Sequence, residues 1–263
     1  MGKSIRLERI MNRENGRTII IPMDHGLTVG PIKGIEKNLG EIVNKIALGG
    51  ANAVLGHIGI PLYAHRGYGP DIGLILHLSG STSISPSKNY KVLVNTVLEA
   101  VKIGADGVSL HINIGTKSDP EMLEILGTIS RECREYGMPL IAMMYPRGEN
   151  IQDEHAVEVV KIAARAAAEL GADIVKTNWT GDQDSFKEVV EGCMAPVIIA
   201  GGEKGGIRDI LEITKQSISV GGAGVAFGRN VFQTENPTNT VRALYLIVHQ
   251  NYEVDEAIKE AGL

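Results

Sequence analysis

Short apolar runs and amphipathic segments alternate along the whole chain. Runs rich in Ile, Val and Leu are typical of strands buried on both faces of a parallel sheet. Such runs predict eight strands, at residues 18–23, 53–56, 72–77, 107–111, 140–144, 174–176, 197–200 and 224–227. The clearest helical spacing of apolar positions falls between them, at residues 35–48, 90–103, 121–136, 154–170 and 207–215. Strands that alternate with helices predict an α/β fold with a parallel sheet.

The turns that lead into the predicted strands resemble one another. Gly-Ala stands at residues 50–51, 104–105, 171–172 and 222–223. A doubly wound open sheet also alternates in this way. Eight strands, Gly-rich turns after the last two and no G-x-G-x-x-G turn after the first favour a closed TIM (β/α)₈ barrel. The 263 residues suit one barrel, and we expect a single domain, residues 1–263, with a short N-terminal helical extension.

Composition limits the possible partners and the compartment. A net charge of −5 and a pI near 5.8 argue against nucleic acid, whose phosphates are bound by concentrated Lys and Arg. No stretch is apolar for long enough to span a bilayer, so no membrane partner is expected. Cys133 and Cys193 lack the close spacing of a zinc site or disulfide framework, and no apolar run follows the polar N-terminal segment. These features predict a cytoplasmic protein.

The carboxyl ends of the predicted strands matter most, because a barrel of this kind carries its active site there. Lys176 ends the sixth strand, directly after Ile174 and Val175. Desolvation at the rim of an apolar barrel favours a free amine, which condenses with a ketone. The resulting iminium draws electrons from the neighbouring C–C bond. The position alone is equally consistent with a salt-bridged lysine at the rim.

Two further side chains at strand ends could assist such a lysine. Asp24 follows the first predicted strand and is a candidate base for a substrate hydroxyl, although an Asp there also suits the cap of a loop. Tyr145 ends the fifth strand. Its phenol can donate a proton to an enamine carbon and take one back, or it can fill space at the barrel rim.

Glycines follow the last two predicted strands, as Gly201-Gly202 and Gly228-Arg229. Many barrels bind phosphate with backbone N–H groups of these two loops, which only glycine lets a ligand approach closely. Arg229 would add a charge-assisted contact. Plain turn glycines are the alternative, but glycines after two consecutive strands favour a phosphate site.

Histidines at or near strand ends raise the possibility of a metal. They are His25, His57, His77 and His111. No His-x-His follows the first strand, and no pair stands at the spacing of ligands on one helix. We therefore expect no metal. A metal-dependent barrel hydrolase and a non-catalytic phosphosugar-binding barrel remain as alternatives.

Several segments together resemble the archaeal-type class I aldolase family. They span nearly the whole chain in the family's order, which makes the resemblance specific. The matching segments are Pro22-Met23-Asp24-His25-Gly26, Tyr145-Pro146-Arg147-Gly148, Val175-Lys176-Thr177-Asn178, Ala200-Gly201-Gly202 and Val225-Ala226-Phe227-Gly228-Arg229-Asn230.

This resemblance implies roles for individual residues. Lys176 would form the Schiff base, Asp24 would accept a proton and Tyr145 would donate one. Neither metal nor cofactor is implied, the substrates would be small phosphosugars and aldehydes, and the protein would be a homo-oligomer built from rings, such as a decamer. The other implied substrate and phosphate contacts are His25, Gly26, Arg147, Asn178, Gly201, Gly202, Gly228 and Arg229.

Two reactions compete within this family. Its fructose-1,6-bisphosphate aldolases usually carry Phe before Asp-His-Gly, Glu-His before Gly-Pro and an aromatic residue two places before the tyrosine. This chain has Met23, Thr28-Val29 and Met143 there, which favours the other reaction, a transaldol exchange. That exchange joins a fragment of 6-deoxy-5-ketofructose 1-phosphate to L-aspartate semialdehyde, on a route to 3-dehydroquinate and the aromatic amino acids. Arg147 is placed to meet the carboxylate of the semialdehyde.

Overall fold

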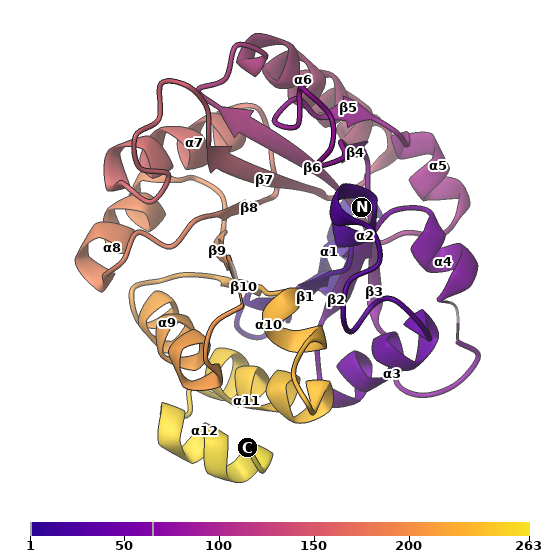
Figure 1. Ribbon diagram of the computed structural model, residues 1–263, viewed down its shortest axis with the longest axis vertical. Helices are drawn as coiled ribbons and strands as arrows, with labels where there is room; N and C mark the ends of the chain where they lie inside the picture. Colours follow the sequence, from indigo (N-terminus) through magenta and orange to yellow (C-terminus); the bar gives the residue numbers. More distant parts are fainter. Residues whose placement is uncertain (1, 65, 203) are drawn as a thin grey trace.

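Eight parallel strands close a barrel in the order β1-β10-β9-β8-β7-β6-β3-β2 (Figure 1). The computed structural model describes residues 2–64, 66–202 and 204–263. Each of the eight predicted strands is present, which confirms the TIM barrel. The barrel strands are β1 Thr18–Pro22, β2 Ala53–Gly56, β3 Gly73–His77, β6 Gly107–Ile114, β7 Leu140–Pro146, β8 Ile174–Thr177, β9 Val197–Ala200 and β10 Gly224–Ala226.

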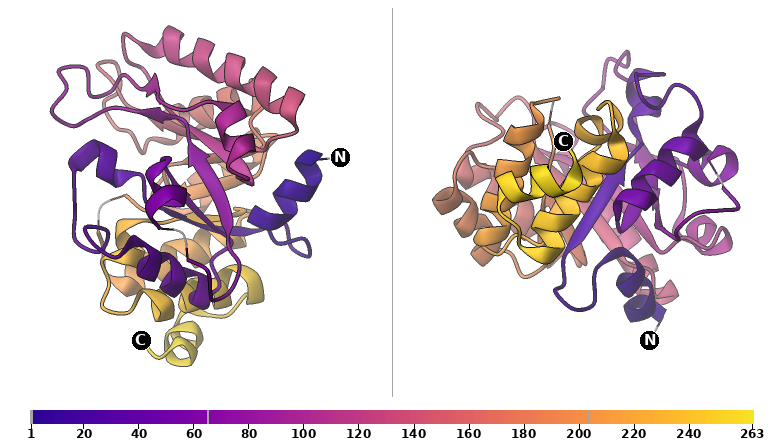
Figure 2. Two further views of the ribbon diagram at one scale, coloured as in Figure 1. Left: turned by 90° about the vertical axis from the view of Figure 1, so that its right-hand side faces the viewer. Right: turned by 90° about the horizontal axis from the view of Figure 1, so that it is seen from below.

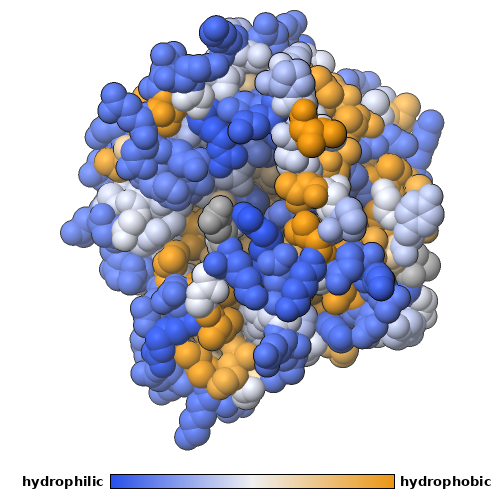
Figure 3. Space-filling view, in the orientation of Figure 1, coloured by the Kyte–Doolittle hydropathy of each residue, from blue (hydrophilic) through white to orange (hydrophobic). Residues whose placement is uncertain are grey.

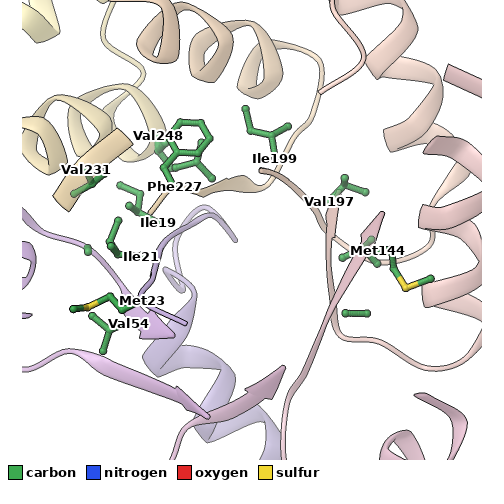
Figure 4. Packing of buried hydrophobic residues seen from close by; sticks show 14 of the residues in the cluster. Ile19, Ile21, Met23, Val54, Met144, Val197, Ile199, Phe227, Val231 and Val248 are labelled. Carbon is green, nitrogen blue, oxygen red and sulfur yellow. The ribbon is translucent and has the colours of Figure 1, made fainter. Parts of the chain in front are cut away.

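Alternate residues of the strands face two separate apolar cores. Ile20 and Ile198 belong to the cluster inside the barrel. Ile19 and Ile21 belong to the larger cluster between the strands and the helices, where Figure 4 shows them near Phe227. Because successive side chains of a strand point to opposite faces, strands buried on both faces read as continuous apolar runs. This is why the strands could be recognised in the sequence.

Helices cover the outer face of the barrel on every side (Figures 1 and 2). Within the described residues, none is long and apolar enough to cross a bilayer. The longer helices are α1 Gly2–Ile10, α3 Leu39–Gly49, α6 Asp119–Tyr136, α7 Val157–Glu169, α8 Gln183–Gly192, α9 Ile207–Ser219, α11 Pro237–Gln250 and α12 Val254–Ala261. The short ones are α2 His25–Val29, α4 Gly59–Tyr63, α5 Val97–Lys102 and α10 Arg229–Phe232.

Helix α1 lies across the end of the barrel where the strands begin. Ile10 is fully buried in the interior cluster and packs against Gly73 and Gly107, the first residues of β3 and β6. Arg9 Nε lies 2.5 Å from Asp106 Oδ1, at the turn before β6. In the left view of Figure 2, α1 and α2 lie at opposite ends of the barrel. The strand-start end is therefore covered by α1, and the site lies at the other end.

The helix predicted over residues 90–103 is wrong in its first half. Residues Val92–Leu93 form β5, which pairs antiparallel with β4, Ser79–Gly80. The helix there is α5, and it begins only after Thr96, whose side chain accepts a hydrogen bond from the N–H of Glu99. Asn95 Nδ2 donates to the backbone oxygen of His77 at 3.0 Å. These bonds to β3 and β4 replace helical hydrogen bonds in the segment before α5.

Two other predicted helices begin too early. The helix predicted from residue 35 begins at Leu39, because Asn38 adopts the left-handed backbone conformation, with φ 51°. The helix predicted from residue 154 begins at Val157. Asp153 accepts a hydrogen bond from the N–H of His155 in a local turn, which the helix does not continue.

Candidate active site

Lys176 lies at the mouth of the barrel, near the end of β8. It follows Ile174 by two residues, and since Ile174 belongs to the interior cluster, the lysine side chain also points inward. The residue is buried, with 6% of its surface exposed. In the described part of the chain, no carboxylate lies within 4.0 Å of its amine. The alternative of a salt-bridged rim lysine therefore does not fit this side chain.

Asp24 lies close to this lysine, just beyond the end of β1. Its side chain is 17% exposed; His25 Nδ1 lies 3.7 Å from one carboxylate oxygen and His77 Nε2 lies 3.9 Å from the other. Burial acts to raise the pKa of Asp24, but His77, His25 and Lys176 together outweigh it and hold that pKa well below its usual range. The carboxylate is therefore ionised at neutral pH, in the form that can accept a proton.

Tyr145 lies on the β7 side of the lysine. Its ring centre is 6.0 Å from Lys176 Nζ and 5.3 Å from Arg147 Cζ, and the ring of His111 is 4.8 Å away. The residue is buried and belongs to the interior cluster. The structure therefore brings together the three side chains for which the sequence predicts catalytic roles.

Arg147 and Asn178 are both engaged by Glu154, in the loop between β7 and α7. Arg147 donates from Nε and Nη2 to Glu154 Oε2, at 3.0 and 2.7 Å. Asn178 Nδ2 donates to the backbone oxygen of Glu154 at 2.9 Å. The positive charge of Arg147 already has a carboxylate partner, and the amide of Asn178 supports the loop. Both side chains hold this edge of the mouth in place.

The glycines after β9 and β10 meet at the opposite edge of the mouth. Gly202 has φ +60°, a conformation that side chains rarely adopt. Arg229 Nη2 donates to the backbone oxygen of Gly202 at 2.7 Å, while its buried Nε has no hydrogen-bond partner among the described residues. Asn230 Nδ2 donates to the oxygen of Gly201 at 2.7 Å. An exposed backbone with a partly unsatisfied guanidinium is suited to bind an anion.

Gly228 joins this corner to the start of the barrel. A Cβ at Gly228 would lie 2.6 Å from His25 Cε1 and 2.7 Å from the backbone oxygen of Pro22, so only glycine fits. The ring of His25 contacts Phe232 edge-on, and its buried Nδ1 has no hydrogen-bond partner within the described ranges. His25 therefore lies between the carboxylate of Asp24 and the glycine corner. Its neighbour Gly26 lines an adjacent pocket.

The other histidines of the mouth are His57, His77 and His111. His77 Nδ1 lies 2.7 Å from Ser109 Oγ, and its ring is 5.1 Å from that of His57. Burial lowers the pKa of His77 to about 4, and burial also lowers the pKa values of His57 and His111. In the described residues, no three or more His, Cys, Asp or Glu side chains are grouped as a metal site requires. Of these histidines, His77 lies against the carboxylate of Asp24, with Nε2 3.9 Å from Oδ2.

Lys91 is a residue of the mouth that the sequence analysis missed. It is 8% exposed, and Nζ donates to Ser81 Oγ at 2.6 Å. Burial lowers the pKa of Lys91, Arg147 lowers it further and Asp24 acts in the opposite sense. The hydrogen bonds of the β4–β5 hairpin to β3 and β6 place Lys91 at the same opening as Lys176. No local motif marks it, because it depends on the β4–β5 hairpin.

A pocket of about 350 Å³ opens beside Asp24, between α2 and α4. Its lining is mainly apolar and includes Met23, Leu27, Tyr63 and Val94. Figure 3 shows polar side chains around the hollow of the barrel mouth, with hydrophobic side chains gathered on one side of it. The mouth therefore offers charged groups at its centre and an apolar surface next to them.

Comparisons with known proteins agree with the barrel fold. Residues 18–234 match the model of a family described as DeoC/LacD family aldolase. The chain is 45% identical over 262 residues to 2-amino-3,7-dideoxy-D-threo-hept-6-ulosonate synthase 1 of Archaeoglobus fulgidus, covering 100% of this chain and 96% of that protein. The corresponding synthase of Halobacterium salinarum is 38% identical over 262 residues, covering 100% and 97%.

A solved structure also matches over nearly the whole barrel. It is an archaeal fructose-1,6-bisphosphate aldolase whose catalytic lysine is covalently bound to the carbinolamine intermediate of its substrate. The TM-score is 0.86 at 32% identity, covering 94% of this chain and 99% of that one. The similarity thus extends from the fold to a protein that uses lysine in covalent catalysis.

Proposed function

Because the chain belongs to the DeoC/LacD family of aldolases, we propose that it makes and breaks carbon–carbon bonds through a Schiff base on Lys176. The observation that carries this proposal is the position of the lysine. Its amine is buried, has no carboxylate within 4.0 Å among the described residues and lies near enough to the ionised Asp24 to lower the pKa of that carboxylate. A buried amine beside a proton acceptor is what capture of a ketone requires.

We propose the reaction of 2-amino-3,7-dideoxy-D-threo-hept-6-ulosonate synthase, which serves biosynthesis of aromatic amino acids. Identity of 45% over the full chain supports this reaction. The residues around the site support it too, since Met23 and Met143 stand where the fructose-bisphosphate aldolases of the family usually carry aromatic residues. The substrates are then 6-deoxy-5-ketofructose 1-phosphate and L-aspartate semialdehyde.

In the first half of the reaction, the Lys176 amine adds to a ketone of the ketose and loses water to form an iminium. The adjacent C–C bond breaks, its electron pair moves into the iminium, and Asp24 takes the proton of the substrate hydroxyl. The pKa of Asp24 is held below its usual range, so the carboxylate is ionised and can accept this proton. A phosphorylated three-carbon aldehyde leaves, and an enamine remains on the lysine.

The enamine then attacks the aldehyde carbon of L-aspartate semialdehyde, and the new alkoxide takes up a proton. Tyr145, whose ring lies between Lys176 and Arg147, is the phenol that exchanges protons during this sequence. Water hydrolyses the iminium, which releases the seven-carbon product and restores the free amine. No step requires a metal or an added cofactor.

We propose that the glycine corner binds the phosphate of the ketose. Gly202 has open space around it, Gly201 and Gly228 leave no room for a Cβ beside their neighbours, and Arg229 carries a buried Nε without a partner within the described residues. His25 lies between this corner and Asp24. A phosphate held here would orient the ketose with its reactive carbons toward the lysine.

Cleavage of fructose 1,6-bisphosphate is the second candidate. It is favoured by the 32% identical archaeal aldolase, which superimposes with a TM-score of 0.86. Both candidates use the same lysine, and they differ in the acceptor. A product assay separates them: rapid cleavage of the bisphosphate without any seven-carbon product would establish the aldolase instead of the synthase.

We further propose a cytoplasmic homo-oligomer. Cys133 and Cys193 are free, and burial raises the pKa of the Cys133 thiol to about 12, so that it stays protonated and unreactive. The family resemblance supports an assembly of several subunits. Sedimentation analysis of the purified protein measures the subunit number.

Borohydride reduction in the presence of the ketose phosphate tests the Schiff base. We expect irreversible loss of activity and added mass on the peptide that carries Lys176. Lys176→Met should abolish both turnover and labelling. Lys187→Met is the matched control, since Lys187 is an exposed lysine on the outer helix α8 and should leave both unchanged. Full activity after reduction, or in Lys176→Met, would refute the assignment.

A further inference from the structure

Lys91 is a buried cation that the proposed chemistry leaves without a task. The residue is 8% exposed, and within the described part of the chain its amine has one hydrogen-bond partner, the hydroxyl of Ser81 at 2.6 Å. No carboxylate in the described residues lies within 4.0 Å of its amine. Burying an ammonium group costs free energy unless an anion compensates it. An anionic ligand in the mouth would supply that compensation.

The β4–β5 hairpin fixes Lys91 at the mouth through bonds to β3 and β6. Ser79 Oγ accepts from the N–H of His111 at 2.9 Å, and Asn95 Nδ2 donates to the oxygen of His77 at 3.0 Å. Asn113 Nδ2 donates to the oxygen of Asn89, two residues before the lysine, at 2.7 Å. The lysine is therefore anchored on both sides, and its position does not depend on a free loop.

The strand order places Lys91 across the mouth from the glycine corner. The hairpin is bonded to β3 and β6, while the glycine corner follows β9 and β10, which lie on the opposite side of the closed ring (Figure 1). Lys176 on β8 stands between them along one half of the ring. The mouth thus has two positively charged edges with the reacting amine in between.

Arg147 is the other cation near Lys91, but it is already neutralised. Both its Nε and its Nη2 bind Glu154, whereas Lys91 has only a neutral hydroxyl. Lys91 also acts on the neighbouring groups. It lowers the pKa values of His111 and His77, in each case by less than burial does. An anion beside Lys91 would therefore meet a buried amine that has no carboxylate within 4.0 Å among the described residues.

We infer that Lys91 binds the carboxylate of the aldehyde acceptor, an inference that rests on the proposed function. The ketose carries one phosphate, for which the glycine corner is available, so the second positive edge is left for the acceptor. L-Aspartate semialdehyde has its carboxylate at the end of the molecule away from the reacting aldehyde. Lys91 is thus the residue that selects an acidic acceptor, in place of Arg147.

The test compares Lys91→Met with Lys88→Met, an exposed lysine of the same segment. We expect Lys91→Met to raise the KM for L-aspartate semialdehyde by roughly 10- to 100-fold, as loss of a charge-assisted bond predicts. Borohydride labelling of Lys176 by the ketose phosphate should stay at the wild-type level, which also shows that the variant is folded. Lys88→Met should match wild type, and Lys91→Arg should recover part of the affinity.

Three results would overturn the inference, and they are distinct. An unchanged KM in Lys91→Met, with the wild type fully active, overturns the role of Lys91 alone. If Lys91→Met lowered the labelling of Lys176 by the ketose phosphate as much as it lowered the affinity for L-aspartate semialdehyde, Lys91 would serve the donor. That result would also overturn the role of Lys91 as acceptor site. Failure of the wild type to form any seven-carbon product overturns the proposed function itself, and the inference with it.

Discussion

Substitution of Ile10 by Ala should destabilise the barrel without touching its chemistry. Ile10 is fully buried where α1 covers the strand-start end, packed against Gly73 and Gly107. The change removes three carbon atoms, worth about 0.8 kcal/mol each in transfer free energy. The cavity adds to this, because two glycines in regular strands cannot move in to fill it. We expect the free energy of unfolding to fall by about 2 to 5 kcal/mol.

Urea unfolding followed by circular dichroism measures this loss as a lower midpoint with an unchanged slope. Ile5→Ala is the matched control, because Ile5 lies on the same helix but is 59% exposed. It should change stability by less than about 0.5 kcal/mol. Both variants should keep wild-type kcat at a temperature where they are folded. Equal destabilisation by the two variants would refute the view that α1 is part of the barrel core.

Three further predictions concern pH and the site. Burial, and to a smaller extent Arg17, lowers the pKa of His249 from 6.5 to about 4. Between these pH values the unfolded chain binds more protons than the folded one, so the free energy of unfolding falls as the pH falls. His249→Gln should therefore weaken the dependence of the urea midpoint on pH in this window. Asp24→Asn should lower kcat about 10²- to 10⁴-fold while the ketose still labels the lysine, and an unchanged kcat would exclude the carboxylate as proton acceptor. Gly228→Ala forces a Cβ against its neighbours and should raise the KM for the ketose phosphate at least about tenfold, whereas Gly192→Ala, with open space around it, should leave that KM unchanged.

The barrel could be predicted because its strands are buried on both faces. The ends of the strands were harder to predict, and three strands run beyond the predicted limits, β8 by a single residue, Thr177. β6 continues to Ile114 and β7 to Pro146. Polar residues occupy the ends of these strands, among them His111 and Asn113. Since these side chains face the mouth, they interrupt the apolar pattern at the place where the barrel becomes a site.

The β4–β5 hairpin could not be predicted, because its apolar residues continue the helical spacing of the segment that follows. Val92 and Leu93 are apolar but 44% and 40% exposed, so they mark no buried helix face. What determines the backbone is the pairing with Ser79–Gly80 and the bond from Asn95 to β3. Such pairing depends on residues more than ten positions away, which a local pattern cannot reveal.

The candidate site could be predicted where residues end a strand, and not elsewhere. Lys176, Asp24 and Tyr145 follow apolar runs, and parallel strands of a barrel bring their ends together. Arg147 and Lys91 were harder to assign, and no role was predicted for Lys91. Arg147 was expected to meet a substrate carboxylate, but Glu154 binds it, and Lys91 enters the mouth from a hairpin outside the barrel. Their partners depend on how the loops fold back, which no spacing indicates.

The pairing of β1 with β10 has a consequence for how the protein is made. Thr18 pairs with Gly224, and Gly228 packs against His25. A ribosome delivers the first of these strands long before the last, so β1 has one unpaired edge during most of synthesis. Asp24, which follows β1, and the glycine corner, which follows β9 and β10, come together only when the ring closes. A nascent chain that stops short of β10 therefore cannot act on a sugar phosphate, and activity begins with closure of the ring.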